Sequence, residues 1–439
     1  MTNTMMRRRT ALSGLSLAAL AACAVKKPPI VGTQIPLVAM DTGMDVAVDA
    51  PAVTVPPAQA LTDWPQSLAN PAHAPGNAAA PLSLKRLWTA DAGAPGGFRA
   101  SLLASPLVAN GQLFTMDSEA VVQAYSPNDG HTLWRRPTRP KHVSVRNMGG
   151  GIAYDSGKIY ASTGFGELLA LDAGSGAILW RQSLQLPARS APLVANGMVF
   201  VTIYNDVLLT FDATSGTPGW RFSGNAGQPS SAAVGVTGAP AFADGIVVAG
   251  FSTGMLAGID AQSGTPLWEQ SLAAGYGQAS ALDFSDIVAS PVIANGVAYA
   301  INLGDTFMAV DLHSGVKVWT KGIGGTQAPA ASGGFIFLLD ARLMLSAVHA
   351  DDGLVSWSTQ MPKYVKPHKK EGPILWSGPT LLNGQLVLTS DHGEIALIDA
   401  ISGKVSQTEE LGAPADMPPI AAAGMLLQLT RNAKLTAYG

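Results

Sequence analysis

Cysteine, histidine, serine and carboxylate side chains build most nucleophilic and metal sites in proteins. This chain of 439 residues has one cysteine and seven histidines, and no histidines stand at a short metal-ligand spacing. Serine, histidine and aspartate are all present, but nothing in the sequence places them together, and no GxxxxGK[ST] phosphate loop occurs. We therefore predict no catalytic residue, no metal ion, no cofactor and no enzymatic activity.

The single cysteine, Cys23, predicts a covalent modification instead. Three arginines, Arg7 to Arg9, precede an apolar run over residues 11–22 that ends in Leu-Ala-Ala. A basic start and a short apolar run are typical of a secretory signal, and the run is too short to span a bilayer. The pattern resembles a bacterial lipobox, which implies a signal peptide over 1–22, lipid on Cys23 and anchoring in a membrane. In the lipoproteins that it resembles, a non-acidic residue after the cysteine, here Ala24, accompanies sorting to the periplasmic face of the outer membrane.

The charge balance argues against nucleic acid as a partner. Lysine and arginine number 27 against 30 aspartates and glutamates, a net charge of −3, so no global positive field exists. Two predicted connections are nevertheless basic, residues 135–146 and 363–370. The first contains Arg135, Arg136, Arg139, Lys141, His142 and Arg146, and the second contains Lys363, Lys366, His368, Lys369 and Lys370. The sequence leaves open whether they are solvated loops or meet anionic lipid or an acidic partner.

Residues 24 to about 80 contain many alanines and prolines, with no lasting apolar periodicity. Such composition is typical of an extended linker. We predict a flexible Ala/Pro-rich tether over residues 23–80, which joins the lipid to a folded body.

The body, residues 81–439, is built from repeats. The clearest marker is a pair of tight turns whose glycines stand 19 residues apart, at Gly111 and Gly130, Gly157 and Gly176, Gly197 and Gly216, Gly245 and Gly264, Gly296 and Gly315, Gly334 and Gly353, and Gly384 and Gly403. The first turn is most often Asn-Gly or Asp-Gly, which suits a type I′ hairpin turn. The second follows an Asp-x-x-Ser-Gly pattern. An eighth first turn, at Gly424, has no second turn before the chain ends.

Each repeat predicts four short antiparallel strands. Apolar β-type runs surround the turns, and a tryptophan stands four residues after the second glycine in six repeats, with Gln407 in the seventh. Repeats of this length with four strands indicate a β-propeller, here with eight blades. We expect the tryptophans to pack between neighbouring blades. The eighth blade lacks its fourth strand, and we expect residues 84–88, with Trp88, to supply it and close the ring. The fold class is thus all-β, an eight-bladed propeller of four-stranded antiparallel blades closed by an N-terminal strand.

Chain direction separates the two faces of such a ring. The two fixed turns of every blade lie on one face, and every blade-to-blade connection lies on the other. All four long insertions, residues 137–150, 223–237, 271–288 and 360–376, therefore fall on the second face. Loops on a rigid scaffold commonly carry function, so we expect a partner there.

Repeats such as residues 171–180, LDAGSGAILW, resemble those of the pyrroloquinoline-quinone type of eight-bladed propeller. That resemblance covers two families. Quinoprotein dehydrogenases use a pair of adjacent cysteines and a calcium site beneath the quinone, and this chain lacks the cysteine pair. The BamB family of outer-membrane assembly lipoproteins shares the lipobox, the cofactor-free blades and the N-terminal closing strand.

The BamB resemblance implies a non-catalytic scaffold that binds the barrel-forming subunit of the outer-membrane assembly machinery and assists unfolded β-barrel precursors. In that family two neighbouring connections bind this subunit. The matching positions here are Ala232 and Val234 in the first connection, where the family's arginine is missing, and Asp286 in the second, where Val288 departs from the family's pattern. Two rival functions remain, a quinone-dependent dehydrogenase and a propeller that binds cell-wall glycan.

Overall fold

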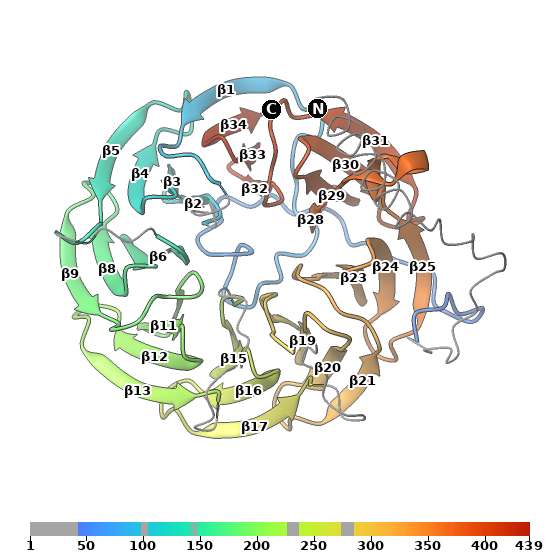
Figure 1. Cartoon of the computed structure of the whole chain (residues 1–439), viewed down its shortest axis with the longest axis horizontal. Coiled ribbons are helices and arrows are strands. Elements are labelled where there is room, and N and C mark those ends of the chain that lie inside the picture. The colour runs from blue at the N-terminus through green and yellow to red at the C-terminus, as the bar shows by residue number, and fades with distance from the viewer. Residues whose placement is uncertain (1–42, 98–103, 142, 144–146, 226–236, 274–284) are drawn as a thin grey trace, which may run out of the picture. The chain divides into compact units, whose positions relative to one another are not determined.

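The computed structural model describes residues 43–97, 104–141, 143, 147–225, 237–273 and 285–439, which form eight four-stranded antiparallel sheets around a central axis (Figure 1). The predicted eight-bladed propeller is confirmed. Within the described residues the only helix is η1 (Pro367–Lys369), a single 3-10 turn. No described helix is long and apolar enough to cross a membrane.

The first four blades follow one another along the chain, each running from the axis outward. Blade 1 is β2 (Leu107–Ala109), β3 (Gln112–Met116), β4 (Val121–Tyr125) and β5 (Thr132–Pro137). Blade 2 is β6 (Gly150–Asp155), β7 (Lys158–Thr163), β8 (Glu167–Asp172) and β9 (Ile178–Ser183). Blade 3 is β10 (Leu193–Ala195), β11 (Met198–Ile203), β12 (Val207–Asp212) and β13 (Pro218–Ser223). Blade 4 is β14 (Ala241–Ala243), β15 (Ile246–Gly250), β16 (Met255–Asp260) and β17 (Pro266–Ser271).

The remaining blades repeat this order, with one insertion and one closing strand. Blade 5 is β18 (Val292–Ala294), β19 (Val297–Ile301), β20 (Phe307–Asp311) and β21 (Lys317–Lys321). Blade 6 is β22 (Ala330–Ser332), β23 (Phe335–Leu339), β24 (Met344–His349) and β25 (Val355–Gln360). Blade 7 is β28 (Trp376–Leu382), β29 (Gln385–Ser390), β30 (Glu394–Asp399) and β31 (Val405–Glu410). Blade 8 is β32 (Ile420–Ala422), β33 (Met425–Leu429), β34 (Lys434–Tyr438) and β1 (Arg86–Asp91), and β26 (Tyr364–Lys366) pairs with β27 (Glu371–Pro373) between blades 6 and 7.

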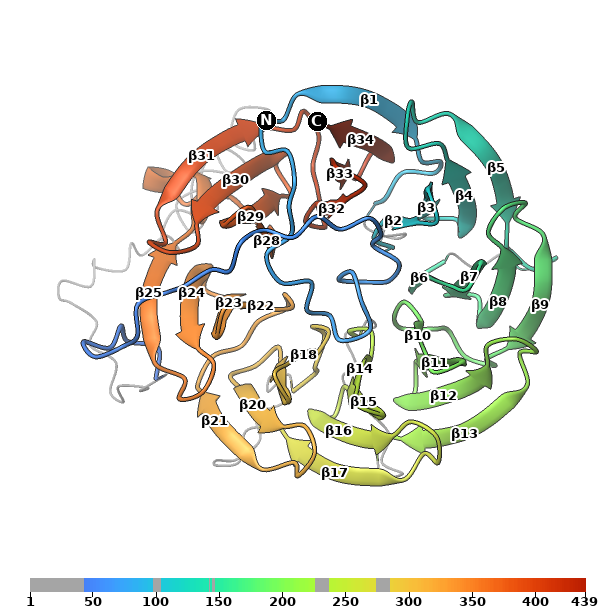
Figure 2. The same ribbon diagram turned by 180° about the vertical axis from the view of Figure 1, so that it is seen from behind.

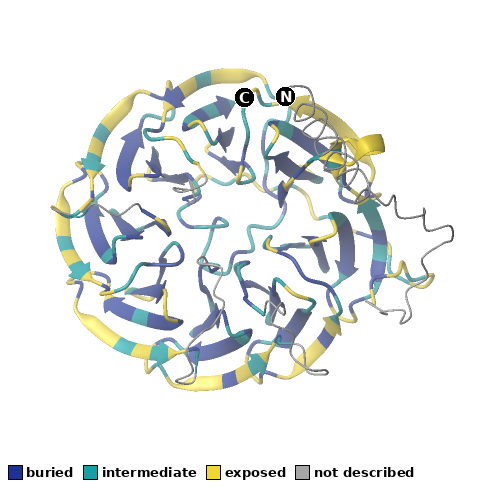
Figure 3. Ribbon diagram, viewed as in Figure 1, coloured by how far each residue is buried: buried dark blue, intermediate teal, exposed yellow. Residues whose placement is uncertain are grey.

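The core lies in the inner strands of the blades. The second and third strands are almost wholly buried, whereas most outermost strands are largely exposed (Figure 3). The turns form as the sequence predicts. In the first turn of blade 1, Asn110 and Gly111 both have positive φ, 49° and 69°, the geometry that a type I′ turn requires.

Tryptophans join successive blades. Trp134 of blade 1 donates its indole N–H to the carbonyl of Ala173 in blade 2 at 2.9 Å, and its ring covers Gly176, where a Cβ would lie 2.5 Å from the ring. Seven such hydrogen bonds connect the blades, from Trp88, Trp134, Trp180, Trp220, Trp268, Trp319 and Trp357. The glycine of the second turn is therefore required twice, for its positive φ and for the space that the ring occupies.

The ring closes at blade 8, where β1 pairs antiparallel with β34. Trp88 on β1 then contacts blade 1 as the other tryptophans contact their neighbours, donating to the carbonyl of Pro127 at 2.9 Å. The junction between blades 7 and 8 has Gln407 in place of tryptophan. That junction is packed instead by Ala78, Ala80, Leu82 and Leu84 from the segment before β1, against Leu397 and Leu426.

The segment over residues 43–80, which we call the strap, differs from the prediction. We expected residues 23–80 to form one flexible tether, but the strap runs across the blades at their tight-turn face and is part of the folded body (Figure 2). Residues 23–42 lie outside the described part of the chain. The strap starts on the outside of blade 6, where the backbone N–H of Ala47 donates to Val355 on β25 at 2.9 Å.

The strap hydrogen-bonds every blade. Its partners in blades 1 to 8 are Val108, Tyr154, Val194, Phe242, Ile293, Gly333, Asn383 and Ala423. Most of these groups belong to the innermost strands, whose edge toward the axis has no strand partner. Carbonyls of the strap accept their N–H groups, for example Pro65 from Tyr154 and Pro71 from Phe242, both at 2.7 Å. The strap therefore satisfies strand edges that a ring of blades leaves unpaired and closes the axis at the tight-turn face.

Candidate partner-binding face and axial cavity

The two faces of the ring carry different structures. The face opposite the strap, which we call the loop face, receives every blade-to-blade connection and every turn between second and third strands. Long connections emerge there after β5, β13, β17 and β25. This face is the candidate partner-binding surface, because the strap does not cover its backbone.

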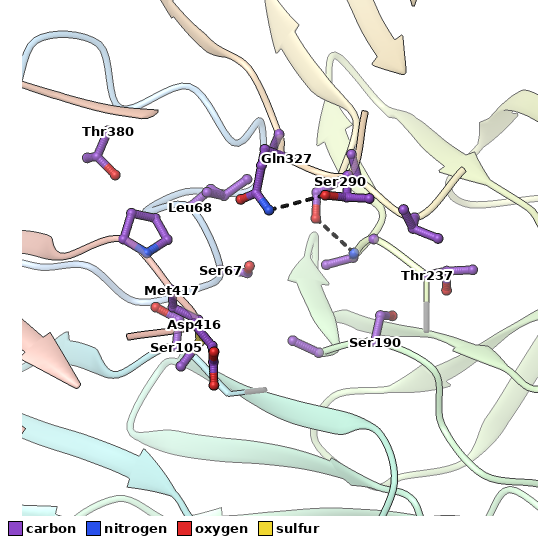
Figure 4. Close-up of a pocket in the computed structure, with 18 of the residues that line it drawn as sticks. Ser67, Leu68, Ser105, Ser190, Thr237, Ser290, Gln327, Thr380, Asp416 and Met417 are labelled. Atoms are coloured by element: carbon purple, nitrogen blue, oxygen red, sulfur yellow. Dashed lines mark hydrogen bonds between the residues drawn. The ribbon is translucent and has the colours of Figure 1, made fainter. Parts of the chain in front are cut away.

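A cavity of about 260 Å³ lies on the axis, bounded by the strap and by residues that precede the innermost strands. Trp64, Ser67 and Leu68 of the strap line it, and hydroxyl groups from several blades surround it (Figure 4). These hydroxyls belong to Ser105, Ser190, Thr237, Ser290, Thr326 and Thr380. The cavity therefore has a mixed polar and apolar lining that comes from most of the ring.

A buried ion pair adjoins this cavity on blade 3. Arg189, which lines the cavity and is 1% exposed, donates from Nη1 to Oδ1 of the fully buried Asp206 at 3.0 Å. Asp206 also accepts the backbone N–H of Ser252 at 3.1 Å and the Ser252 hydroxyl. The carboxylate thus accepts three hydrogen bonds, which compensate the burial of its charge.

Among the described residues Arg189 forms a side-chain hydrogen bond only through Nη1, and the Tyr204 ring centroid lies 5.9 Å from its guanidinium carbon. Its Nε and Nη2 atoms are fully buried and find no hydrogen-bond acceptor in the described part of the chain, and the hydroxyls of Ser190 and Thr237 are likewise buried without a partner there. The backbone N–H of Thr237 donates to the carbonyl of Arg189 at 3.4 Å, so these groups are neighbours. Unpaired buried donors are costly and therefore rare in folded proteins.

A second carboxylate, Asp416, lines the cavity on another side (Figure 4). It forms a bidentate ion pair with Arg431, which includes a 2.8 Å contact from Nε to Oδ2, and both side chains are about one third exposed. Asp416 raises the pKa of Arg431 through this contact. The acidic charge at the cavity is therefore balanced.

The basic residues of the segment 135–146 occupy different parts of the structure. Arg135 and Arg136 belong to the outer strand β5, and Arg136 donates to the carbonyl of Gly176 at 2.7 Å. Arg139 stacks on Phe165, with its guanidinium carbon 4.8 Å from the ring centroid. His142 and Arg146 lie outside the described residues.

The basic segment over 363–370 forms a hairpin, β26–η1–β27, where the sequence predicted a loop. Lys363, Lys366, His368, Lys369 and Lys370 are all exposed. Lys366 pairs with Glu371 at 3.3 Å, but both side chains are more than half exposed, so the pair adds little to stability. We call residues 363–373 the basic hairpin, a compact positive surface on the loop face.

The residues predicted for partner binding and lipidation have different outcomes. Cys23, Ala232 and Val234 lie outside the described part of the chain. Asp286 is only 3% exposed, and its carbonyl accepts the N–H of Leu303 at 2.8 Å, so it lies in the wall of blade 5. Contact with a partner requires it to become exposed, and its role stays a prediction.

The sequence reading missed Arg189 and Asp206. The one available signal was an arginine within a stretch of small residues, 187–192 (PARSAP), directly before an innermost strand. Its partner stands 17 residues away in a turn, and only the closed blade brings the two together.

The pyrroloquinoline-quinone cofactor that the repeat type implies does not fit these residues. The chain has a single cysteine, so the adjacent cysteine pair cannot form. In the described ranges no group of three or more His, Cys, Asp or Glu side chains could hold a metal ion. The cavity-lining Asp416 and the buried Asp206 beside Arg189 are already paired with arginines.

The fold and its repeats define an eight-bladed propeller of the pyrroloquinoline-quinone repeat type. The family model described as outer membrane protein assembly factor BamB matches residues 118–359, more than half of the sequence. The chain belongs to the outer membrane protein assembly factor BamB family.

Individual relatives agree with this assignment. The chain is 23% identical over 366 residues to the outer membrane protein assembly factor BamB of Yersinia pestis, a match that covers 81% of this chain and 89% of that protein. The Escherichia coli protein of that name is 26% identical over 355 residues, 77% of this chain and 85% of its own. The crystal structure of BamB from Moraxella catarrhalis superimposes with a TM-score of 0.66 at 15% identity, covering 81% of this chain and 99% of that one, which shows a shared fold.

In sequence, a quinoprotein matches a smaller part of the chain. Quinohemoprotein alcohol dehydrogenase ADH IIB of Pseudomonas putida is 30% identical over 145 residues, which cover 29% of this chain and 21% of the enzyme. The shared part is thus about a third of the propeller.

Proposed function

We propose that the protein is a non-catalytic scaffold lipoprotein of outer-membrane β-barrel assembly. It binds the barrel-forming subunit of the assembly machinery through its loop face and holds that subunit near incoming β-barrel precursors. Membership of the BamB family supports the assembly role, and the cofactor misfit supports a function without chemistry.

The observation that carries this proposal is the difference between the two faces. The strap hydrogen-bonds all eight blades at the tight-turn face and closes the axis there. The loop face keeps its cavity, its long connections and the basic hairpin. A rigid ring with one sealed face and one face of varied loops is suited to present a surface to a large partner.

The position of the strap also suits a lipid anchor on Cys23. The strap begins beside blade 6, at the outer side of the ring. The 20 residues from Cys23 to Gly43 have a maximum reach of about 70 Å. An anchor attached at the rim leaves the loop face free to bind.

Charge provides a second element of recognition. The basic hairpin is exposed on the loop face of a chain whose net charge is −3. A local positive surface on a near-neutral protein steers an acidic partner surface and fixes its orientation more than it adds affinity. We assign the hairpin this steering role.

Copurification tests the proposal. The lipidated protein, extracted from its native outer membrane in gentle detergent, should bring a large barrel protein with periplasmic modules in near-equal amount. A Cys23→Ala variant should leave the membrane fraction but keep its fold. Recovery of the wild type alone, or with glycan only, would contradict the scaffold role and favour the wall-binding rival, while dye reduction after addition of quinone and calcium would favour the dehydrogenase.

A further inference from the structure

The loop face of blades 2 and 3, which are neighbours in the ring (Figure 1), carries a group of accessible apolar side chains. Met148 is 64% exposed in the connection between blades 1 and 2, and Tyr204 is 49% exposed in the turn between β11 and β12. Phe165, in the turn between β7 and β8, and Leu186, in the connection between blades 2 and 3, are half-buried. We call these four residues the aromatic patch.

The backbone brings the aromatic patch together as one surface. Gly164 and Gly166 flank the phenylalanine and approach both connections. A Cβ on Gly164 would lie 2.4 Å from the backbone nitrogen of Met148, and one on Gly166 would lie 3.2 Å from the carbonyl oxygen of Leu186. The backbone N–H of Tyr204 donates at 3.0 Å to the carbonyl of the proline that follows Leu186. The patch is therefore continuous, unlike the single apolar side chains that are common on protein surfaces.

The turn that carries Tyr204 is held in place by the buried ion pair. Asp206, in the same turn, accepts Nη1 of Arg189 at 3.0 Å and the backbone N–H of Ser252 at 3.1 Å. The Ser252 hydroxyl also donates to Asp206. The guanidinium carbon of Arg189 lies 5.9 Å from the centroid of the Tyr204 ring, within the range of a cation–π contact. These contacts connect the turn to the blade 2–3 connection and to blade 4.

Stability alone does not account for this network. The attraction within a buried ion pair is offset by the desolvation of both charges, and apolar replacements of such pairs are often neutral or stabilising. Nε and Nη2 of Arg189 add to the cost, because they find no acceptor in the described part of the chain. What the network does supply is a fixed position for Tyr204. A side chain that is ordered before a partner arrives loses less conformational entropy on binding.

The composition of the patch matches the centre of a protein–protein interface. Tyrosine, phenylalanine, methionine and arginine are enriched in such centres. Arg139 lies over the Phe165 ring, 4.8 Å from its centroid, so a positive charge adjoins the apolar surface. Glu167, in the same turn, is paired with Arg181. The complementary partner surface is therefore an apolar side chain flanked by carboxylates.

We propose that the aromatic patch anchors the barrel-forming subunit, and that Arg189, Asp206 and Ser252 position Tyr204 for that contact. The inference rests on the proposed scaffold function and adds to it the contact surface, the chemistry of the partner and the positioning residues. The subunit packs an apolar side chain against Met148 and Tyr204, with its carboxylates on the side of Arg139.

Capture of the purified barrel-forming subunit by the full lipidated chain in detergent tests the patch. Tyr204→Ser with Met148→Ser should weaken capture at least about tenfold, because both exposed anchors are lost. Val316→Ser with Ile401→Ser is the matched control, since these residues are 62% and 56% exposed beside second turns at the tight-turn face. It should capture the subunit as the wild type does. Both double variants should melt close to the wild type, because the replaced side chains are exposed.

A double-mutant cycle tests the positioning role. Ser252→Ala removes a hydroxyl that donates to Asp206. It should weaken capture about threefold in the wild type and add nothing in the Tyr204→Ser background. Ser346→Ala is the control, because it removes a buried hydroxyl on blade 6 that lies 2.8 Å from the Ser358 hydroxyl. This control should leave capture unchanged.

The outcomes separate the patch from the proposed function. If the wild type captures no barrel-forming subunit, the proposed function fails and the patch falls with it. If the wild type captures the subunit and Tyr204→Ser with Met148→Ser captures it equally well, the function stands and the patch is wrong. If Ser252→Ala weakens capture equally with and without Tyr204, the network does not act through Tyr204 and the positioning role is wrong.

Discussion

The tight-turn face and the loop face are built from the same strands but follow opposite rules. At the tight-turn face blades 1 to 7 end in the same two turns, and glycine and tryptophan contacts join successive blades at every junction except that between blades 7 and 8. The strap covers the inner edges. At the loop face the connections differ in length and composition. The contacts that stabilise the ring are concentrated at the tight-turn face, whereas the sequence can vary more at the loop face.

This division explains why the spacing between the two turns of a repeat is constant, whereas the connections between repeats vary in length. A residue at the tight-turn face is fixed by a positive φ, by a ring contact or by the strap, so few replacements fit. A residue at the loop face projects from a scaffold that is already stable, so replacements alter recognition rather than folding.

We expect the largest loss of folding stability from a substitution in the strap. Trp64 is 2% exposed, pairs with β2 through two backbone hydrogen bonds and packs between blades 8 and 1. Trp64→Ala should lower the free energy of unfolding by about 3–5 kcal/mol, measured by guanidinium denaturation. Val48→Ala, at a fully exposed strap residue, is the control and should cost almost nothing. Equal midpoints for the two variants would mean that the strap does not stabilise the ring.

The strap should also make stability depend on pH. His73 is buried and its Nδ1 lies 2.7 Å from the carbonyl of Pro291, and burial lowers its pKa from 6.5 to about 4. The unfolded chain therefore takes up this proton first as pH falls, so the contribution is complete above about pH 6.5 and is lost between 6.5 and 4. On going from pH 7 to pH 5 the wild type should lose about 2 kcal/mol through this group.

The comparison that isolates His73 is with His73→Gln, denatured in urea at both pH values. The variant should lose less stability than the wild type between pH 7 and pH 5. An identical loss in both proteins would show that His73 does not titrate as a buried group.

Two glycine variants, with a smaller expected loss of stability, should separate the cost of contact with the tryptophan ring from the cost of backbone strain. Gly130 and Gly111 have nearly the same φ, 72° and 69°, but a Cβ on Gly130 would lie 2.5 Å from Trp88, whereas nothing lies within 4 Å at Gly111. Both alanine variants carry the strain of a positive φ. Gly130→Ala should cost about 1–2 kcal/mol more than Gly111→Ala in denaturation experiments. Similar losses would indicate that the tryptophan moves aside freely.

The smallest effect on stability is expected at the loop face. Lys363→Glu with Lys369→Glu should change unfolding by less than about 0.5 kcal/mol, because both side chains are exposed. The same pair should weaken capture of the partner. Lys317→Glu with Lys404→Glu makes the same change in net charge at exposed positions beside the second turns and should leave capture intact. Equal loss in both double variants would point to net charge rather than to the hairpin.

The repeat spacing made most of the propeller predictable. The turn glycines and the tryptophan at a fixed distance from them were enough to predict eight blades and closure of the ring by β1. Both signals are local in the sequence and depend on residue type. The strap was not predictable in this way. Its carbonyls, such as those of Pro65 and Pro71, accept backbone N–H groups, and any residue can supply a carbonyl.

The sequence predicted which face of the ring carries the candidate site, but not which residues form it. Chain direction placed the long connections together, but Arg189 and Asp206 meet only after blade 3 closes, and Asp286 is buried although its sequence position suggested a surface contact. The packing between blades, rather than the pattern of residue types, decides which polar groups become buried.

Photo-crosslinking in the native membrane tests the division of the two faces most directly. Asn196 and Tyr204 flank the same strand, β11, and are both exposed, but Asn196 belongs to a tight turn and Tyr204 to the loop face. A photoreactive phenylalanine analogue at Tyr204, or at Lys369 in the basic hairpin, should form an adduct with the barrel-forming subunit, and the same analogue at Asn196 should not. An adduct from Asn196 with none from Tyr204 or Lys369 would contradict the account.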